Sequence, residues 1–240
     1  MPLCRTTHRL FGSISISLSA LLLAVFPLIR PFFPLDPRIP AETLAAASPA
    51  ITSIAWVVSH LLCTLAFVLL LYGMLTLYLV LASSAVEPRA FRALVLSLAG
   101  IALILPMLGV ETYMLPILVK LYLAGQAGIA PAIDLIYRGP AVGVFLLGLL
   151  LLAIGVIMFA VAIWHSAVLP RWAGVLFARG LALWFPPFPR VIRIIDGFAI
   201  GLGGLWLAWT LRHKTSSGPT RVCRRRHSVR SSRASAVCRA

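Results

Sequence analysis

The sequence predicts an all-α fold: a polytopic bundle of about six transmembrane helices followed by a disordered, basic C-terminal tail. Hydrophobic residues make up 61% of the chain and charged residues only 11%, whereas about a quarter of residues are charged in soluble domains. No formally charged side chain occurs between Glu42 and Glu87. This stretch is long enough to cross a bilayer, because about 20 apolar residues in a helix span a hydrocarbon core of roughly 30 Å.

Six apolar runs are candidates for membrane spans, and each is read as a helix because a lone strand in lipid would leave its backbone unpaired. The fifth run is the weakest, since it carries Arg179 and stops at Pro186 and Pro187. It would need its flanks or local thinning of the bilayer to cross. Pro106 and Pro116 interrupt the third run, where membrane helices tolerate a kink. The predicted spans are residues 10–29, 51–81, 93–123, 141–164, 172–187 and 191–211.

Two longer connections join these runs. Residues 30–50 are rich in proline, so we expect an extended, non-helical chain for much of this connection. Residues 124–140 place Ile129, Ile133 and Ile136 at helical spacing. This spacing favours a short helix at the membrane interface.

The basic residues of the chain predict its orientation. The formal net charge is +15, and nine of the 21 Lys and Arg residues follow Leu211. Most of the others lie between apolar runs, where basic residues set the orientation of a membrane protein. Six spans put both termini on one side, and the basic tail makes that side the cytoplasm. We therefore expect a multi-pass protein of the bacterial cytoplasmic (inner) membrane.

The tail, residues 212–240, is rich in Arg and Ser and has no apolar periodicity, which predicts disorder. A basic cytoplasmic segment of this kind is attracted to anionic lipid headgroups. Nucleic-acid binding is the weaker alternative, because the tail contains no aromatic residue on which a base could stack.

No motif for a cofactor or a catalytic centre is found in the sequence. The cysteines form no CxxC pair, which argues against a zinc site or a disulfide framework. A haem held by two histidines is disfavoured, since His60 is the only histidine well inside a predicted span. No phosphate loop, nucleophile elbow or HExxH motif occurs. We therefore expect no cofactor, and a non-enzymatic role is favoured.

The informative polar residues of the predicted spans are His60 and Glu111, because ionisable side chains inside a bilayer are costly and usually face a partner or a cavity. His60 is about 14 Å along the second span, and Glu111 is about 27 Å along the third, which runs the opposite way. The two residues are therefore expected at comparable depth, as a pair. Such a pair could relay protons or bind a polar substrate, or it could fix the packing of two helices, which is the favoured interpretation. Arg193 and Asp196 are at the spacing of a structural ion pair.

The last span contains a helix-packing seam of small residues, Gly197, Gly201 and Gly204, at GxxxG-type spacing. Such a seam favours close helix contact, inside one chain as readily as between chains. Two functions are therefore considered. One is a small transporter or permease-like protein that uses the His60–Glu111 pair. The alternative is a non-catalytic membrane protein that packs against partner helices through small-residue seams, in a homo- or hetero-oligomer.

A basic turn, VLPRWAG at residues 168–174, lies between two late spans and precedes a proline-rich break and a glycine-rich last helix. Earlier spans carry His60, Leu71-Tyr72-Gly73, and Glu111 followed by Pro116. In these features the chain resembles a loose group of uncharacterised bacterial multi-pass integral membrane proteins with a VLPRWAG-like turn. The resemblance extends to about Leu211 and implies a helical membrane fold, with no established activity. The chain departs from the group in its shorter fifth span and its long tail.

Overall fold

The computed structural model describes residues 2–31, 40–184 and 189–213, and within them the chain is helical with no strand. The all-α prediction is confirmed. Disorder was predicted for the tail, residues 212–240, and the tail residues beyond His213 lie outside the described part. The elements are α1 (Pro2–Ile29), α2 (Pro40–Ile51), α3 (Ile54–Leu81), α4 (Glu87–Gly109), the π-helix η1 (Val110–Met114), α5 (Leu115–Leu123), α6 (Ile129–Arg138), α7 (Pro140–Ser166), α8 (Arg171–Ala182) and α9 (Arg190–His213).

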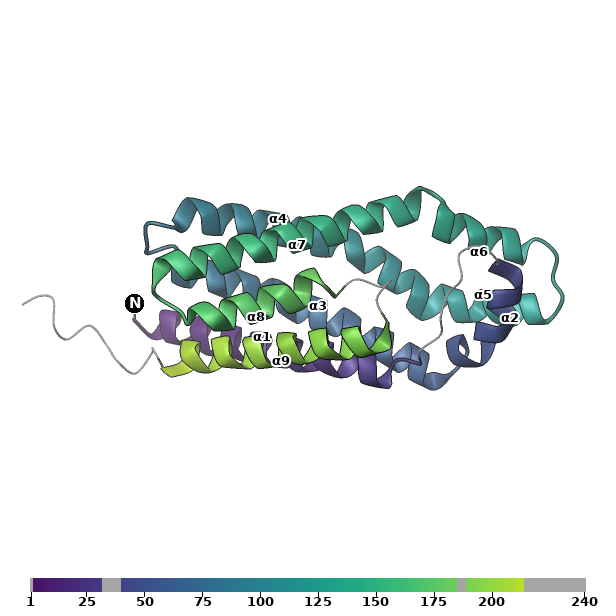
Figure 1. The fold of residues 1–240 in the computed structure, drawn as a ribbon, viewed down its shortest axis with the longest axis horizontal. Helices are drawn as coiled ribbons and strands as arrows, with labels where there is room; N and C mark the ends of the chain where they lie inside the picture. The colour runs from purple at the N-terminus through teal and green to yellow at the C-terminus, as the bar shows by residue number, and fades with distance from the viewer. Residues whose placement is uncertain (1, 32–39, 185–188, 214–240) are drawn as a thin grey trace, which may run out of the picture.

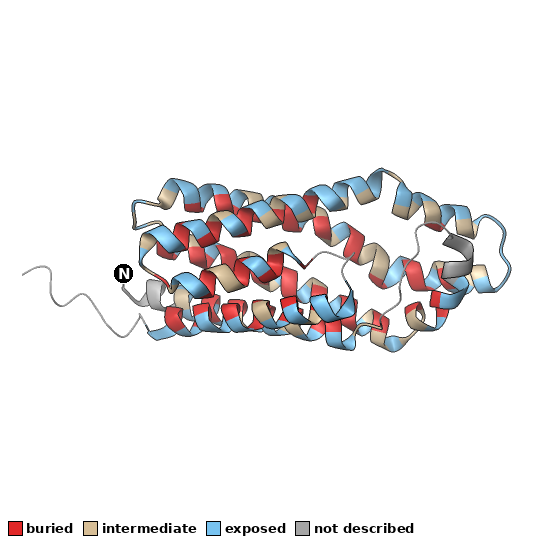
Figure 2. Ribbon diagram, in the orientation of Figure 1, coloured by how far each residue is buried: buried red, intermediate tan, exposed pale blue. Residues whose placement is uncertain are grey.

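Five helical stretches of the described chain are long and apolar enough to cross a membrane, as expected of a multi-pass membrane protein. Exposed residues line the outward faces of these helices (Figure 2). They include large apolar side chains, for example Leu147, Leu150 and Ile157 on α7. Exposure of this kind is natural where the surrounding solvent is lipid. The five stretches are His8–Ile29, Ile54–Leu81, Glu87–Leu123, Ile129–Ser166 and Arg190–His213.

The helices run back and forth along one long axis (Figure 1). Near the end of α9, Arg212 donates a 3.1 Å hydrogen bond to Ser13, near the start of α1. The start of α1 and the end of α9 therefore lie at the same end of the bundle. At the opposite end α2, α5 and α6 form a separate apolar cluster, which includes Ile51, Val119 and Ile133.

The glycine seam of α9 is occupied by α1 of the same chain. A Cβ atom at Gly197 would lie 3.1 Å from the carbonyl oxygen of Ala24, and a Cβ atom at Gly204 would collide with the Cβ of Ala20. Because glycine has no side chain, these two positions of α9 let the helices approach closely. This contact brings the end of α1 next to the start of α9.

The predicted fifth span, residues 172–187, is represented within the described chain by the short helix α8. α8 has 12 residues, which correspond to about 18 Å, too little to cross a bilayer core alone. It packs against both α7 and α9, and its buried face includes Gly174 and Phe177. α8 is therefore not among the five helices long enough to span.

The two longer connections between the predicted spans contain the helices α2 and α6. The connection 30–50 was predicted to be extended for much of its length, but α2 makes it helical from Pro40 onward, and residues 32–39 lie outside the described part. Proline is compatible with the first turn of a helix, where an N–H group would have no intrahelical acceptor. The short helix expected around Ile129 is observed as α6.

The expected ion pair between Arg193 and Asp196 does not form. Arg193 instead extends toward α1, where its guanidinium lies over the Phe26 ring, 5.9 Å from the ring centroid. The Oδ2 atom of Asp196 is buried without a hydrogen-bond partner. Local spacing allows the pair, but the packing of α9 on α1 directs Arg193 elsewhere.

Candidate functional site: a buried histidine–glutamate pair

The structure brings His60 and Glu111 together. His60 lies in the second turn of α3 and is fully buried, and Glu111 is the second residue of η1. The Nε2 atom of His60 is 3.0 Å from the Oε2 atom of Glu111. Another ion pair of the described chain, between Arg138 and Asp134, lies near the surface of α6.

The hydrogen bonds of the imidazole determine where its protons lie. The Nδ1 atom of His60 is 2.8 Å from the carbonyl oxygen of Trp56. A carbonyl can only accept, so Nδ1 carries a proton and donates it. Nε2 then has two choices: it donates to an ionised Glu111, or it accepts from a protonated one. In both arrangements one proton lies between Nε2 and Oε2, and the pair has no net charge.

The π-helix η1 positions Glu111 for this contact. A π-helix is wider than an α-helix, and such segments are frequent at functional sites. The indole Nε1 of Trp56 donates a 2.8 Å hydrogen bond to the backbone carbonyl of Glu111. Two residues of α3 thus contact Glu111: Trp56 binds its main chain and His60 binds its side chain. This role of Trp56 was not predicted, although Trp56 and His60 are four residues apart and therefore share one face of α3.

Aromatic side chains surround the imidazole. The rings of Trp56 and His60 are tilted to each other with centroids 4.4 Å apart, and Phe26 of α1 meets His60 edge-on at 5.6 Å. Tyr137 of α6 lies near the Glu111 carboxylate. Four elements, α1, α3, η1 and α6, therefore contribute to the site. Their packing leaves His60 inaccessible, while the Glu111 side chain keeps 21% of its exposure.

Two arginines lie near the pair. The guanidinium of Arg30, which follows α1, is 4.7 Å from the centre of the Trp56 ring. Arg30 and Arg193 both interact favourably with the Glu111 carboxylate through their charges. Positive charge therefore comes close to the Glu111 carboxylate from the end of α1 and from the start of α9.

The described residues contain no group of three His, Cys, Asp or Glu side chains that could share a metal ion. Cys63, one turn beyond His60, is buried with a free thiol. The site as described can hold and transfer a proton. The expectation that no cofactor is bound stays a prediction.

Comparisons of the chain with protein-family models, with curated proteins and with solved structures find no match. The resemblance to a group of bacterial membrane proteins therefore stays a prediction. The function has to be argued from the geometry of the His60–Glu111 pair.

Proposed function

We propose that the protein is a small proton-coupled transporter of the bacterial cytoplasmic membrane, with both termini in the cytoplasm. In this proposal the His60–Glu111 pair carries the proton. The observation that supports it is the 3.0 Å contact of Nε2 with Oε2, combined with the donor role that the Trp56 carbonyl imposes on Nδ1. Together they leave one proton between the two side chains.

The surroundings of the pair suit proton transfer inside a membrane. Because the pair is neutral whichever partner holds the proton, the proton can change partner without placing a net charge in the apolar core. Glu111 is partly exposed and His60 is not. Protons therefore reach the pair through the Glu111 carboxylate, and His60 acts as the inner partner.

The alternative function, binding of partner helices through small-residue seams, has less support. The seam of Gly197, Gly201 and Gly204 is filled by Ala20, Ala24 and Pro27 of α1. A second chain could reach this face of α9 only by displacing α1.

Glu111→Gln separates proton transfer from a structural role. The amide of glutamine can still donate to Nε2 of a neutral His60, but it cannot release a proton. We expect the variant to fold like the wild type and to lose proton movement. The measurement uses proteoliposomes with a trapped pH-sensitive dye and an imposed proton gradient. Inorganic phosphate, an amino-acid mixture and glucose are supplied in turn as polar solutes.

Glu87→Gln is the matched control, because Glu87 accepts a 3.1 Å hydrogen bond from Tyr78 away from the site. This control should move protons like the wild type. If Glu111→Gln moves protons at the wild-type rate, the pair does not carry them. If in addition His60→Ala yields no folded protein, the pair is a structural contact between α3 and η1.

A further inference from the structure

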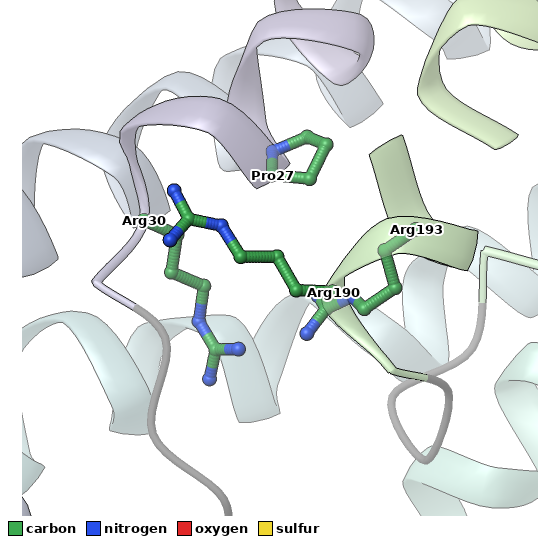
Figure 3. Close-up of a pocket in the computed structure, with 4 residues that line it drawn as sticks. All are labelled: Pro27, Arg30, Arg190 and Arg193. Atoms are coloured by element: carbon green, nitrogen blue, oxygen red, sulfur yellow. The ribbon is translucent and has the colours of Figure 1, made fainter. Parts of the chain in front are cut away.

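A second polar site lies beside the first, where the end of α1 meets the start of α9. Gly197 packs against Ala24 and Pro27, with a Cβ position 3.1 Å and 3.2 Å from their atoms. This contact places Arg30, which follows α1, next to the first turn of α9. A pocket opens between the two helices, and its lining residues are Pro27, Arg30, Arg190 and Arg193 (Figure 3).

The three arginines of this pocket lack an acidic partner in the described chain. The ion pairs found there join His60 to Glu111 and Asp134 to Arg138. Glu111, which interacts at longer range with two of the arginines, is already bonded to His60. Three guanidinium groups around one pocket repel one another, and the N-terminus of α9 adds further positive potential.

Two of these guanidinium groups are held in place without using their hydrogen-bond donors. Arg30 lies over the Trp56 ring and its Nε atom is buried with no hydrogen-bond partner. Arg193 keeps only 9% of its exposure and lies over the Phe26 ring. A guanidinium that stacks through its face keeps its in-plane N–H groups available. A buried donor without an acceptor is costly, so the Nε atom of Arg30 favours a ligand that brings an acceptor oxygen.

We propose that the pocket binds a phosphate group. A phosphate offers three anionic or acceptor oxygens to three guanidinium groups, and arginine is the preferred partner of phosphate because its donors form a planar fork. The pocket is small, about 10 Å³, and has room for about one water-sized group. One phosphate oxygen therefore enters the pocket, while the rest of the ligand stays at its mouth. This site does not depend on proton transfer by His60 and Glu111.

Two sources of phosphate fit this chemistry. Arg30 directly follows α1, a helix long and apolar enough to cross a membrane, so it lies at the end of a candidate span. The phosphate of an anionic lipid could thus bind from the side. A free phosphate could bind from the aqueous phase, since Arg190 is exposed.

The test uses the full-length protein, purified in detergent and free of phosphate. Binding of radiolabelled inorganic phosphate is measured directly, and retention of phosphatidic acid against phosphatidylcholine is measured by native mass spectrometry. Arg190→Gln is the main variant, because Arg190 is exposed and its loss leaves the core intact. We expect the affinity of this variant for whichever ligand the wild type binds to fall about tenfold, as for the loss of one charge-assisted hydrogen bond. Arg92→Gln, an exposed arginine on α4, is the control and should bind like the wild type.

Arg30→Lys keeps the charge but removes the planar fork, and it should also weaken binding while the protein remains folded. Binding of both ligands identifies a free anion as a ligand of the pocket, and binding of phosphatidic acid alone identifies the lipid headgroup. The proposal is overturned if the wild type retains neither ligand. It is also overturned if Arg190→Gln and Arg30→Lys bind like the wild type, or if Arg92→Gln weakens binding as much as Arg190→Gln does.

Discussion

The indole Nε1 of Trp56 donates a 2.8 Å hydrogen bond to the backbone carbonyl of Glu111. This bond joins the first turn of α3 to the π-helix that interrupts the helical stretch Glu87–Leu123. The same tryptophan supplies the carbonyl that orients the His60 imidazole and the ring over which Arg30 lies. Trp56 therefore contacts both the His60–Glu111 pair and Arg30 of the arginine pocket.

Trp56→Phe should destabilise the protein while preserving most of its packing. The phenyl ring retains the apolar contact but cannot donate to the Glu111 carbonyl, which is left without this partner. We expect a loss of about 1–3 kcal/mol in the free energy of unfolding, measured by denaturant titration of the purified protein. Trp172→Phe is the control, because Trp172 is 63% exposed and contacts Trp164 through its ring. Equal stability of the two variants would contradict a role for the Trp56 bond.

Gly204→Ala should weaken the contact between α1 and α9. A Cβ atom at this position collides with Ala20 and approaches the Phe177 ring, and overpacking of this kind costs about 1–3 kcal/mol. At Gly143 of α7 a Cβ atom meets nothing within 4 Å, so Gly143→Ala should be neutral or stabilising by up to about 1 kcal/mol, the gain in helix propensity. Thermal unfolding of both variants tests the contrast. If Gly204→Ala is as stable as the wild type, α1 can move away from α9 at no cost in stability, and the expected overpacking is contradicted.

The proposed orientation predicts the result of reporter fusions. A fusion after Gly139, between α6 and α7, should report the outside, and a fusion after Leu211 should report the cytoplasm. The second expectation uses the hydrogen bond of Arg212 with Ser13, which places the end of α9 beside the start of α1. A fusion after Ser83, between α3 and α4, is a further cytoplasmic control. An outside signal at Leu211 would contradict the orientation.

The basic tail, residues 212–240, is predicted to lie near anionic lipid. Each Lys or Arg close to the surface contributes about 1 kcal/mol of attraction, and salt screens this attraction within a Debye length. A synthetic peptide of this segment should bind anionic vesicles and release them as the salt concentration rises. Neutral vesicles are the control. Equal binding to both vesicle types, or binding that salt does not weaken, would exclude an electrostatic attraction.

The sequence by itself determined the long apolar helices of the fold and the level of His60 and Glu111 along them. A bilayer requires long apolar helices, so hydropathy alone located the helical stretches that include α1, α3, α4, α7 and α9. The constant rise per residue of a helix also placed His60 and Glu111 at one level. Depth is a one-dimensional quantity, and the order of residues along the chain is enough to calculate it.

Only the tertiary structure decided how the helices face one another. The rotation of α3 turns Trp56 and His60 toward η1, and the close packing of Gly197 on Ala24 gathers Arg30 and Arg193 from distant parts of the chain. The same packing directs Arg193 toward Phe26 of α1 and away from Asp196. Lateral position and rotation depend on side-chain packing between helices, for which the apolar pattern of a membrane span carries little information, since its lipid-facing and buried residues are alike apolar.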